Sequence, residues 1–118
     1  MVQERRKSPR IRAYLPVRLH RPDVHQAVET LTKDISFEGV RYVSSMLCPV
    51  STELKLELVL STGREQLETR VKTAWFRTLP ESEQFECGVS FVELSNENQR
   101  RLSAYLDHLS RLQSLVPA

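Results

Sequence analysis

Much of this sequence alternates apolar and polar residues with the period of two that is typical of half-buried β-strands. The clearest run is residues 53–60, in which every second residue is a leucine. Residues 67–77 continue the alternation and place Trp75 on the same face as the apolar residues. Turn-forming residues 61–63 separate the two runs, so residues 53–77 are predicted to form a long antiparallel hairpin.

The remaining short runs predict four more strands and one helix. The expected strands cover residues 14–20, 27–35, 40–43 and 85–91. After Val92 the period changes, because apolar residues recur at spacings of three and four, the stripe of an amphipathic helix from about residue 95 to 116. Ser95 is placed to cap its N-terminus.

Six short strands followed by one helix, with no long crossover helices between strands, exclude a parallel sheet. We therefore expect an all-β fold, a six-stranded antiparallel barrel, with the C-terminal helix packed across it. Residues 13–118 are expected to form this single domain. Residues 1–12 contain five basic side chains and one acidic one, and they are expected to be a flexible segment without a strand.

Composition points to a cytoplasmic protein without membrane insertion. No run of residues approaches the 18 or so consecutive apolar residues of a membrane span, and the N-terminus is charged where a signal peptide would be apolar. The net charge of +2 is too small to argue for bulk nucleic-acid binding. Cys48 and Cys87 show neither metal-ligand spacing nor a paired-thiol motif, so both are predicted to be reduced thiols.

Catalysis finds little support in the sequence, and we expect no enzyme activity, no metal and no cofactor. The three histidines, His20, His25 and His108, lie on a strand, a loop and a helix, outside any nucleophile or metal motif. The hairpin carboxylates Glu53, Glu57, Glu65 and Glu68 are expected to face outward as a solvated surface. There is no glycine-rich loop for phosphate.

Two short motifs remain, and they are more informative together than apart. In the first, Arg6 and Arg10 lie four residues apart, and Arg5 precedes them. The second places a carboxylate, a hydroxyl and a glycine at fixed offsets on a turn between two strands, at Asp34, Ser36 and Gly39. The arginine spacing is expected by chance roughly once in a chain of this composition, whereas the second motif arises by chance in roughly one such chain in a hundred.

Together, the two motifs resemble the PilZ family, which is defined by an Arg-x-x-x-Arg segment upstream of an Asp/Asn-x-Ser-x-x-Gly segment. Residues 87–94 and the polar helix start that follows are also similar to that family's last strand and C-terminal helix. Glu38 stands where relatives often have a second glycine. The resemblance implies the PilZ-type barrel and a receptor for cyclic di-GMP, bound between the arginine segment and the barrel surface.

The chemistry of this ligand suits the motif residues. An arginine can donate two hydrogen bonds to guanine O6 and N7, and a carboxylate can accept from N1–H and the N2 amine. We assign Arg10, Asp34 and Ser36 to guanine recognition. Arg6 and Arg5 are assigned to phosphate or the second guanine, and Gly39 to the backbone shape of the turn at positive φ. Ligand binding is expected to order the N-terminal segment, which would then present a new surface to an unidentified effector protein.

Two alternatives belong to other functional classes. A small barrel with a basic arm could bind RNA or single-stranded DNA, but this needs exposed stacking aromatics, and only Phe37 and Tyr42 are predicted near the site. The domain could instead be a protein-interaction module without ligand. The intact motif residues argue against that second alternative.

Overall fold

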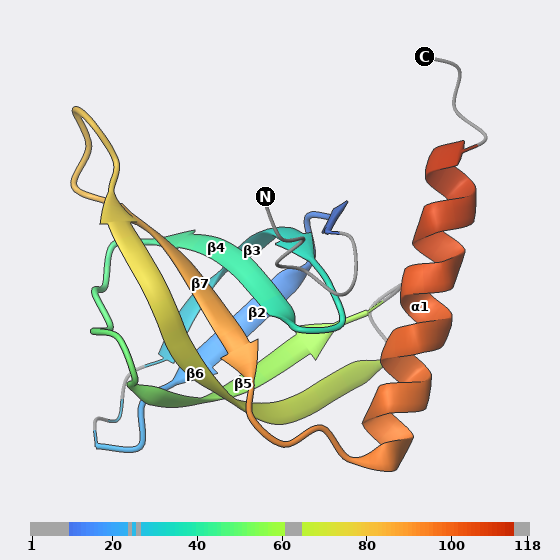
Figure 1. The fold of residues 1–118 in the computed structure, drawn as a ribbon. Coiled ribbons are helices and arrows are strands. Elements are labelled where there is room, and N and C mark those ends of the chain that lie inside the picture. The colour runs from blue at the N-terminus through green and yellow to red at the C-terminus, as the bar shows by residue number, and fades with distance from the viewer. Residues whose placement is uncertain (1–9, 24, 26, 61–64, 115–118) are drawn as a thin grey trace, which may run out of the picture.

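The computed structural model describes residues 10–23, 25, 27–60 and 65–114. Seven strands and one helix follow each other along the chain (Figure 1). They are β1 (Ile11–Arg12), β2 (Pro16–His20), β3 (Ala27–Ile35), β4 (Gly39–Ser44), β5 (Glu53–Val59), β6 (Gln66–Thr78), β7 (Phe85–Phe91) and α1 (Asn96–Ser114). All six predicted strands and the predicted helix are confirmed, with ends that differ by a few residues.

Every strand pairing is antiparallel, and six of the strands close into a barrel. The order around the barrel is β3, β2, β5, β6, β7 and β4, and pairing between β3 and β4 closes the ring. The predicted hairpin is the β5–β6 pair, in which Glu53 lies opposite Lys72 and Val59 opposite Gln66. The fold class predicted from the periodicity is therefore correct.

The interior of the barrel is filled by the apolar face of each strand. On β5, Leu54, Leu56 and Leu58 are buried, whereas Glu53 and Lys55, at alternate positions, are exposed. Because side chains alternate across a strand, one face of each hairpin supplies the core and the other meets water. Both cysteines contribute to this core as free thiols, and burial raises the pKa of each.

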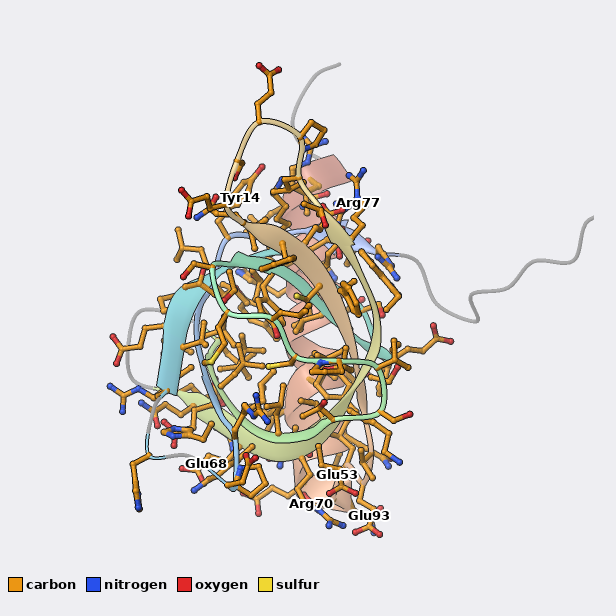
Figure 2. All side chains as sticks on the ribbon, turned by 90° about the vertical axis from the view of Figure 1, so that its left-hand side faces the viewer. Tyr14, Glu53, Glu68, Arg70, Arg77 and Glu93 are labelled. Atoms are coloured by element: carbon orange, nitrogen blue, oxygen red, sulfur yellow. The ribbon has the colours of Figure 1, made fainter. Side chains whose placement is uncertain are left out.

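Helix α1 lies against one end of the barrel and is seen behind it in Figure 2. Ser95 caps the helix as predicted, because its Oγ accepts a hydrogen bond of 3.1 Å from the backbone N–H of Asn98. Leu102 and Leu106 are buried against the barrel. Leu112, further along the predicted apolar stripe, is 46% exposed, so the stripe is buried only over the first part of the helix.

One strand was not expected. Ile11 and Arg12 form β1, which pairs with Ile35 and Asp34 of β3, inside the segment that was predicted to contain no strand. Ile11 is buried, and the buried hydroxyl of Thr32 fastens the chain between β1 and β2. Thr32 Oγ1 donates to the carbonyl oxygen of Ala13 at 2.5 Å and accepts from the N–H of Leu15 at 2.9 Å. The first paired residue in the described part of the chain is therefore Ile11, directly after Arg10.

The alternation of β6 is interrupted before its end. The register between β6 and β7 shifts between Thr73, which pairs with Val89, and Trp75, which pairs with Gly88, so Ala74 is a bulge. A one-residue bulge reverses the face of every residue after it. Placing Trp75 with the core residues was therefore wrong: it is only half-buried, and its indole lies over Gly88.

Candidate functional site

Asp34 lies near the end of β3, where β1 and β4 flank it on either side. It is 8% exposed. Its Oδ2 lies 2.7 Å from Arg41 Nη2, and its Oδ1 lies 3.7 Å from Arg10 Nη1. Arg41 is on β4, directly opposite Asp34 in the strand register, while Arg10 immediately precedes β1. The short strand β1 thus places Arg10, the second arginine of the first motif, beside the carboxylate of Asp34.

A second buried carboxylate lies next to this pair. Glu86, on β7, is 3% exposed. Its Oε1 lies 2.6 Å from Arg77 Nε, and its Oε2 lies 3.2 Å from Arg41 Nη1. Burial alone would raise the pKa of the Glu86 carboxyl, but the hydrogen bond from Arg77 and the charges of Arg41, Arg77 and Lys33 together hold that pKa below its ordinary value. Glu86 is therefore a stably ionised partner for both arginines.

The turn between β3 and β4 is built around Ser36. Its Oγ accepts a hydrogen bond from the N–H of Glu38 at 3.0 Å, and its own N–H donates to the carbonyl oxygen of Gly39 at 2.9 Å. Glu38 in turn accepts a hydrogen bond from the N–H of Phe91 at the end of β7, also at 2.9 Å. Ser36 thus fixes the turn, while its hydroxyl hydrogen can still be donated to a ligand.

Gly39 is needed for close packing of the backbone. Its φ does not lie in the left-handed region, so the expected positive φ was wrong. Instead, a Cβ on Gly39 would lie 1.9 Å from the carbonyl oxygen of Val89 on β7. Only a residue without a side chain lets β4 approach β7 this closely.

Two neighbouring hollows share Arg10 as a wall. The smaller, of about 130 Å³, is also lined by Ser36, Gly39 and Trp75. The larger, of about 630 Å³, has Arg10 and Asp34 in its lining, together with the residues Arg12, Tyr14, Lys33, Arg41 and Gln113. The structure thus brings together the predicted residues Arg10, Asp34, Ser36 and Gly39. Arg5 and Arg6 lie outside the described residues.

The comparison with known families agrees with this arrangement. A family model, described as the PilZ domain, matches residues 4–108. The chain belongs to the PilZ domain family. The resemblance inferred from the two motifs is therefore confirmed, and it extends over both motifs and most of helix α1.

Solved structures share the fold of this PilZ domain. The inhibitor of motility MotI/DgrA of Bacillus subtilis is 23% identical, with a TM-score of 0.77, over 94% of this chain and 52% of its own. The PilZ domain of YcgR from Escherichia coli, solved with c-di-GMP, is 14% identical, with a TM-score of 0.73, over 93% of this chain and 95% of its own. MrkH of K. pneumonia, in its c-di-GMP complex, is 19% identical, with a TM-score of 0.77, over 96% and 56%.

The chain thus spans about half the length of MotI and MrkH and nearly all of the YcgR domain. No curated protein sequence matches it. Within the described residues, no helix is long and apolar enough to cross a membrane. In that same part of the chain, no three His, Cys, Asp or Glu side chains gather closely enough to hold a metal ion.

Several residues at the site of this PilZ domain were not predicted. Arg41 follows the second motif by two residues and was visible as a polar residue between Val40 and Tyr42, but its two carboxylate partners come from other strands. Tyr14 is 62% exposed and lines the larger hollow. Tyr42, which was predicted near the site as a stacking aromatic, is instead 1% exposed within the core.

Proposed function

We propose that this PilZ domain is a receptor for cyclic di-GMP. The observation on which the proposal rests is the convergence of Arg10, Asp34, Ser36 and Gly39 on adjoining hollows, although they come from two separated segments of the chain. The c-di-GMP complexes of the YcgR domain and MrkH, which share the fold, support the choice of ligand.

The geometry suits a guanine base with neighbouring phosphates. Arg10 lies between the two hollows, where its guanidinium can donate to O6 and N7 of a guanine. Asp34 can accept from the opposite edge of the base, where guanine has donors and adenine lacks the matching pair. Arg12 and Lys33, in the lining of the larger hollow, add positive charge for the phosphates.

The N-terminal segment completes the proposed site. Arg5 and Arg6 are assigned to phosphate or to the second guanine, by their position in the motif. Binding would order residues 1–9 over the nucleotide, with charged hydrogen bonds offsetting the entropy that the segment loses. The ordered segment would then present a surface to an effector protein. In this proposal, the domain works in the cytoplasm and performs no catalytic step.

Isothermal titration calorimetry of the purified protein tests the proposal. We expect saturable heat with cyclic di-GMP and much weaker binding of GTP and cyclic di-AMP, because two linked guanines engage both motifs. A single-stranded oligonucleotide tests the nucleic-acid alternative in the same experiment. Heat with the oligonucleotide and none with cyclic di-GMP would support that alternative. No heat with any of these compounds would favour a protein-interaction module.

A further inference from the structure

Arg41 joins the two buried carboxylates of the site. Its Nη2 lies 2.7 Å from Asp34 Oδ2, and its Nη1 lies 3.2 Å from Glu86 Oε2. Glu86 is held on its other oxygen by Arg77 Nε at 2.6 Å. These four side chains form a row of alternating charge that crosses four strands. The row runs from β6 through β7 and β4 to Asp34 on β3.

A carboxylate can recognise the donor edge of a base only if its plane is held in one orientation. The terminal torsion of an aspartate is broad, so the side chain alone does not define that plane. The fork of a guanidinium is rigid and planar, and it fixes a carboxylate more strictly than a lysine ammonium does. Anchored on Glu86, Arg41 holds Oδ2 of Asp34 and leaves Oδ1 turned toward Arg10.

The same contact keeps Arg10 available to a ligand. Asp34 and Arg10 are only loosely associated at 3.7 Å, whereas Arg41 makes the close contact. Without Arg41, the buried carboxylate would need another cation, and among the described residues the next one paired with it is Arg10. A direct Arg10–Asp34 pair would occupy both groups that are assigned to the base.

We propose that Arg41 is a positioning residue that sets the preference of this site for guanine, and that Glu86 and Arg77 act through it. The proposal rests on cyclic di-GMP being the ligand. Arg41 itself makes no base contact in this scheme. Its role is to hold Asp34 in place and to leave Arg10 free.

The test is the Arg41→Lys variant, titrated with cyclic di-GMP and with cyclic di-AMP. Lysine keeps the positive charge but lacks the fork that bridges two carboxylates. We expect the ratio of the two affinities to fall about tenfold, within the range for losing a base-specific hydrogen-bond pair. A purely structural role for Arg41 would weaken both ligands equally and leave that ratio unchanged.

Arg70→Lys is the matched control. Arg70 also bridges two carboxylates, with Nη2 2.9 Å from Glu93 and Nη1 3.7 Å from Glu53. Figure 2 shows these three residues at the bottom of the view, on the opposite side of the barrel from Arg77. The control variant should therefore bind both nucleotides as the wild type does.

A double-mutant cycle tests whether Glu86 acts through Arg41. Glu86→Gln alone should also lower the affinity ratio, and it should add little in the Arg41→Lys background, because the contact that it supports is already lost. Glu86 is buried, so circular dichroism must show that this variant folds. If it does not fold, the ratio measured for Arg41→Lys still tests the role of Arg41. That variant is expected to fold, because Arg41 is partly exposed at the surface.

The outcomes separate this inference from the proposed function. Failure of the wild type to bind cyclic di-GMP overturns the proposed function and, with it, the inference. Binding by the wild type, with an unchanged ratio in Arg41→Lys, overturns the inference alone. Tighter binding of cyclic di-GMP by Arg41→Lys would also overturn it, since Arg41 would then compete with the base for Asp34.

Discussion

Replacing Gly39 by alanine should destabilise the barrel where β4 and β7 approach most closely. The added Cβ would lie 1.9 Å from the carbonyl oxygen and 2.9 Å from the carbonyl carbon of Val89. The strands must separate by about 1 Å before that contact reaches even 3.0 Å, the closest approach that real Cβ atoms show. Both contact atoms belong to the backbone, so no side-chain rotation can relieve the clash.

The expected loss of stability follows from three terms. Overpacking of this kind costs about 1 to 3 kcal/mol. The adjacent hydrogen bond from Phe91 N–H to the Glu38 carbonyl is strained by the same movement, which adds about 1 kcal/mol. Reduced freedom of the unfolded chain returns roughly 0.5 kcal/mol. The sum is about 1.5 to 3.5 kcal/mol, or a fall of roughly 6 to 14 °C in melting temperature for a domain of this size.

Differential scanning calorimetry measures this change, and Gly88→Ala is the informative comparison. A Cβ on Gly88 would meet the indole of Trp75 at 2.3 Å, and a half-buried side chain can turn aside. Gly88→Ala should therefore lower the melting temperature by less than half as much. A Gly39→Ala protein that melts within about 2 °C of the wild type would show that β4 and β7 have room for a side chain.

Three further predictions concern the charged groups. Arg10→Ala should lower the affinity for cyclic di-GMP at least about tenfold by calorimetry. The melting temperature of the free protein should change little, because the contact between Arg10 and Asp34 is long. Unaltered affinity would remove Arg10 from the site. Deleting residues 1–9 retains Arg10 and β1, so the protein should keep a native circular dichroism spectrum and a cooperative melt while its affinity falls about tenfold or more; full affinity would show that Arg5 and Arg6 make no contact with the ligand. The folded-state pKa of Glu86 is depressed, so its contribution to stability is complete above the unfolded-state pKa and is lost as the pH falls through the folded-state value. The drop in melting temperature between pH 7 and about pH 3 should therefore be smaller for Glu86→Gln than for the wild type, and equal drops would contradict the assigned pairing.

The strands and the helix could be predicted because each depends on a local period. Leucines at every second position of residues 53–60 leave only one face to bury, and this holds whichever strand becomes the neighbour. Strand β1 was not predicted because two residues are too few to show the alternation of a strand. Its position depends on pairing with β3 and on the hydroxyl of Thr32, neither of which is local in sequence.

The candidate site was predictable only as far as its motifs. Asp34, Ser36 and Gly39 are close together in sequence, so their grouping on one turn followed from the spacing. Trp75 was assigned to the wrong face because the sequence around Ala74 does not predict a bulge. The bulge arises from the pairing of β6 with β7. Arg41 was missed because its role depends on partners from β3 and β7.

Closure of the ring by β3 and β4 affects how the protein behaves at high concentration. An open sheet ends in rows of unpaired backbone groups that can recruit a strand from another molecule and seed aggregation. Here the six barrel strands each have two neighbours within the ring, and the additional strand, β1, which pairs with β3, is only two residues long. At the end of that strand, the carbonyl of Arg12 accepts a hydrogen bond of 2.9 Å from Gln113 of α1. In the described part of the chain, edge-to-edge strand addition therefore finds little exposed backbone on which to begin.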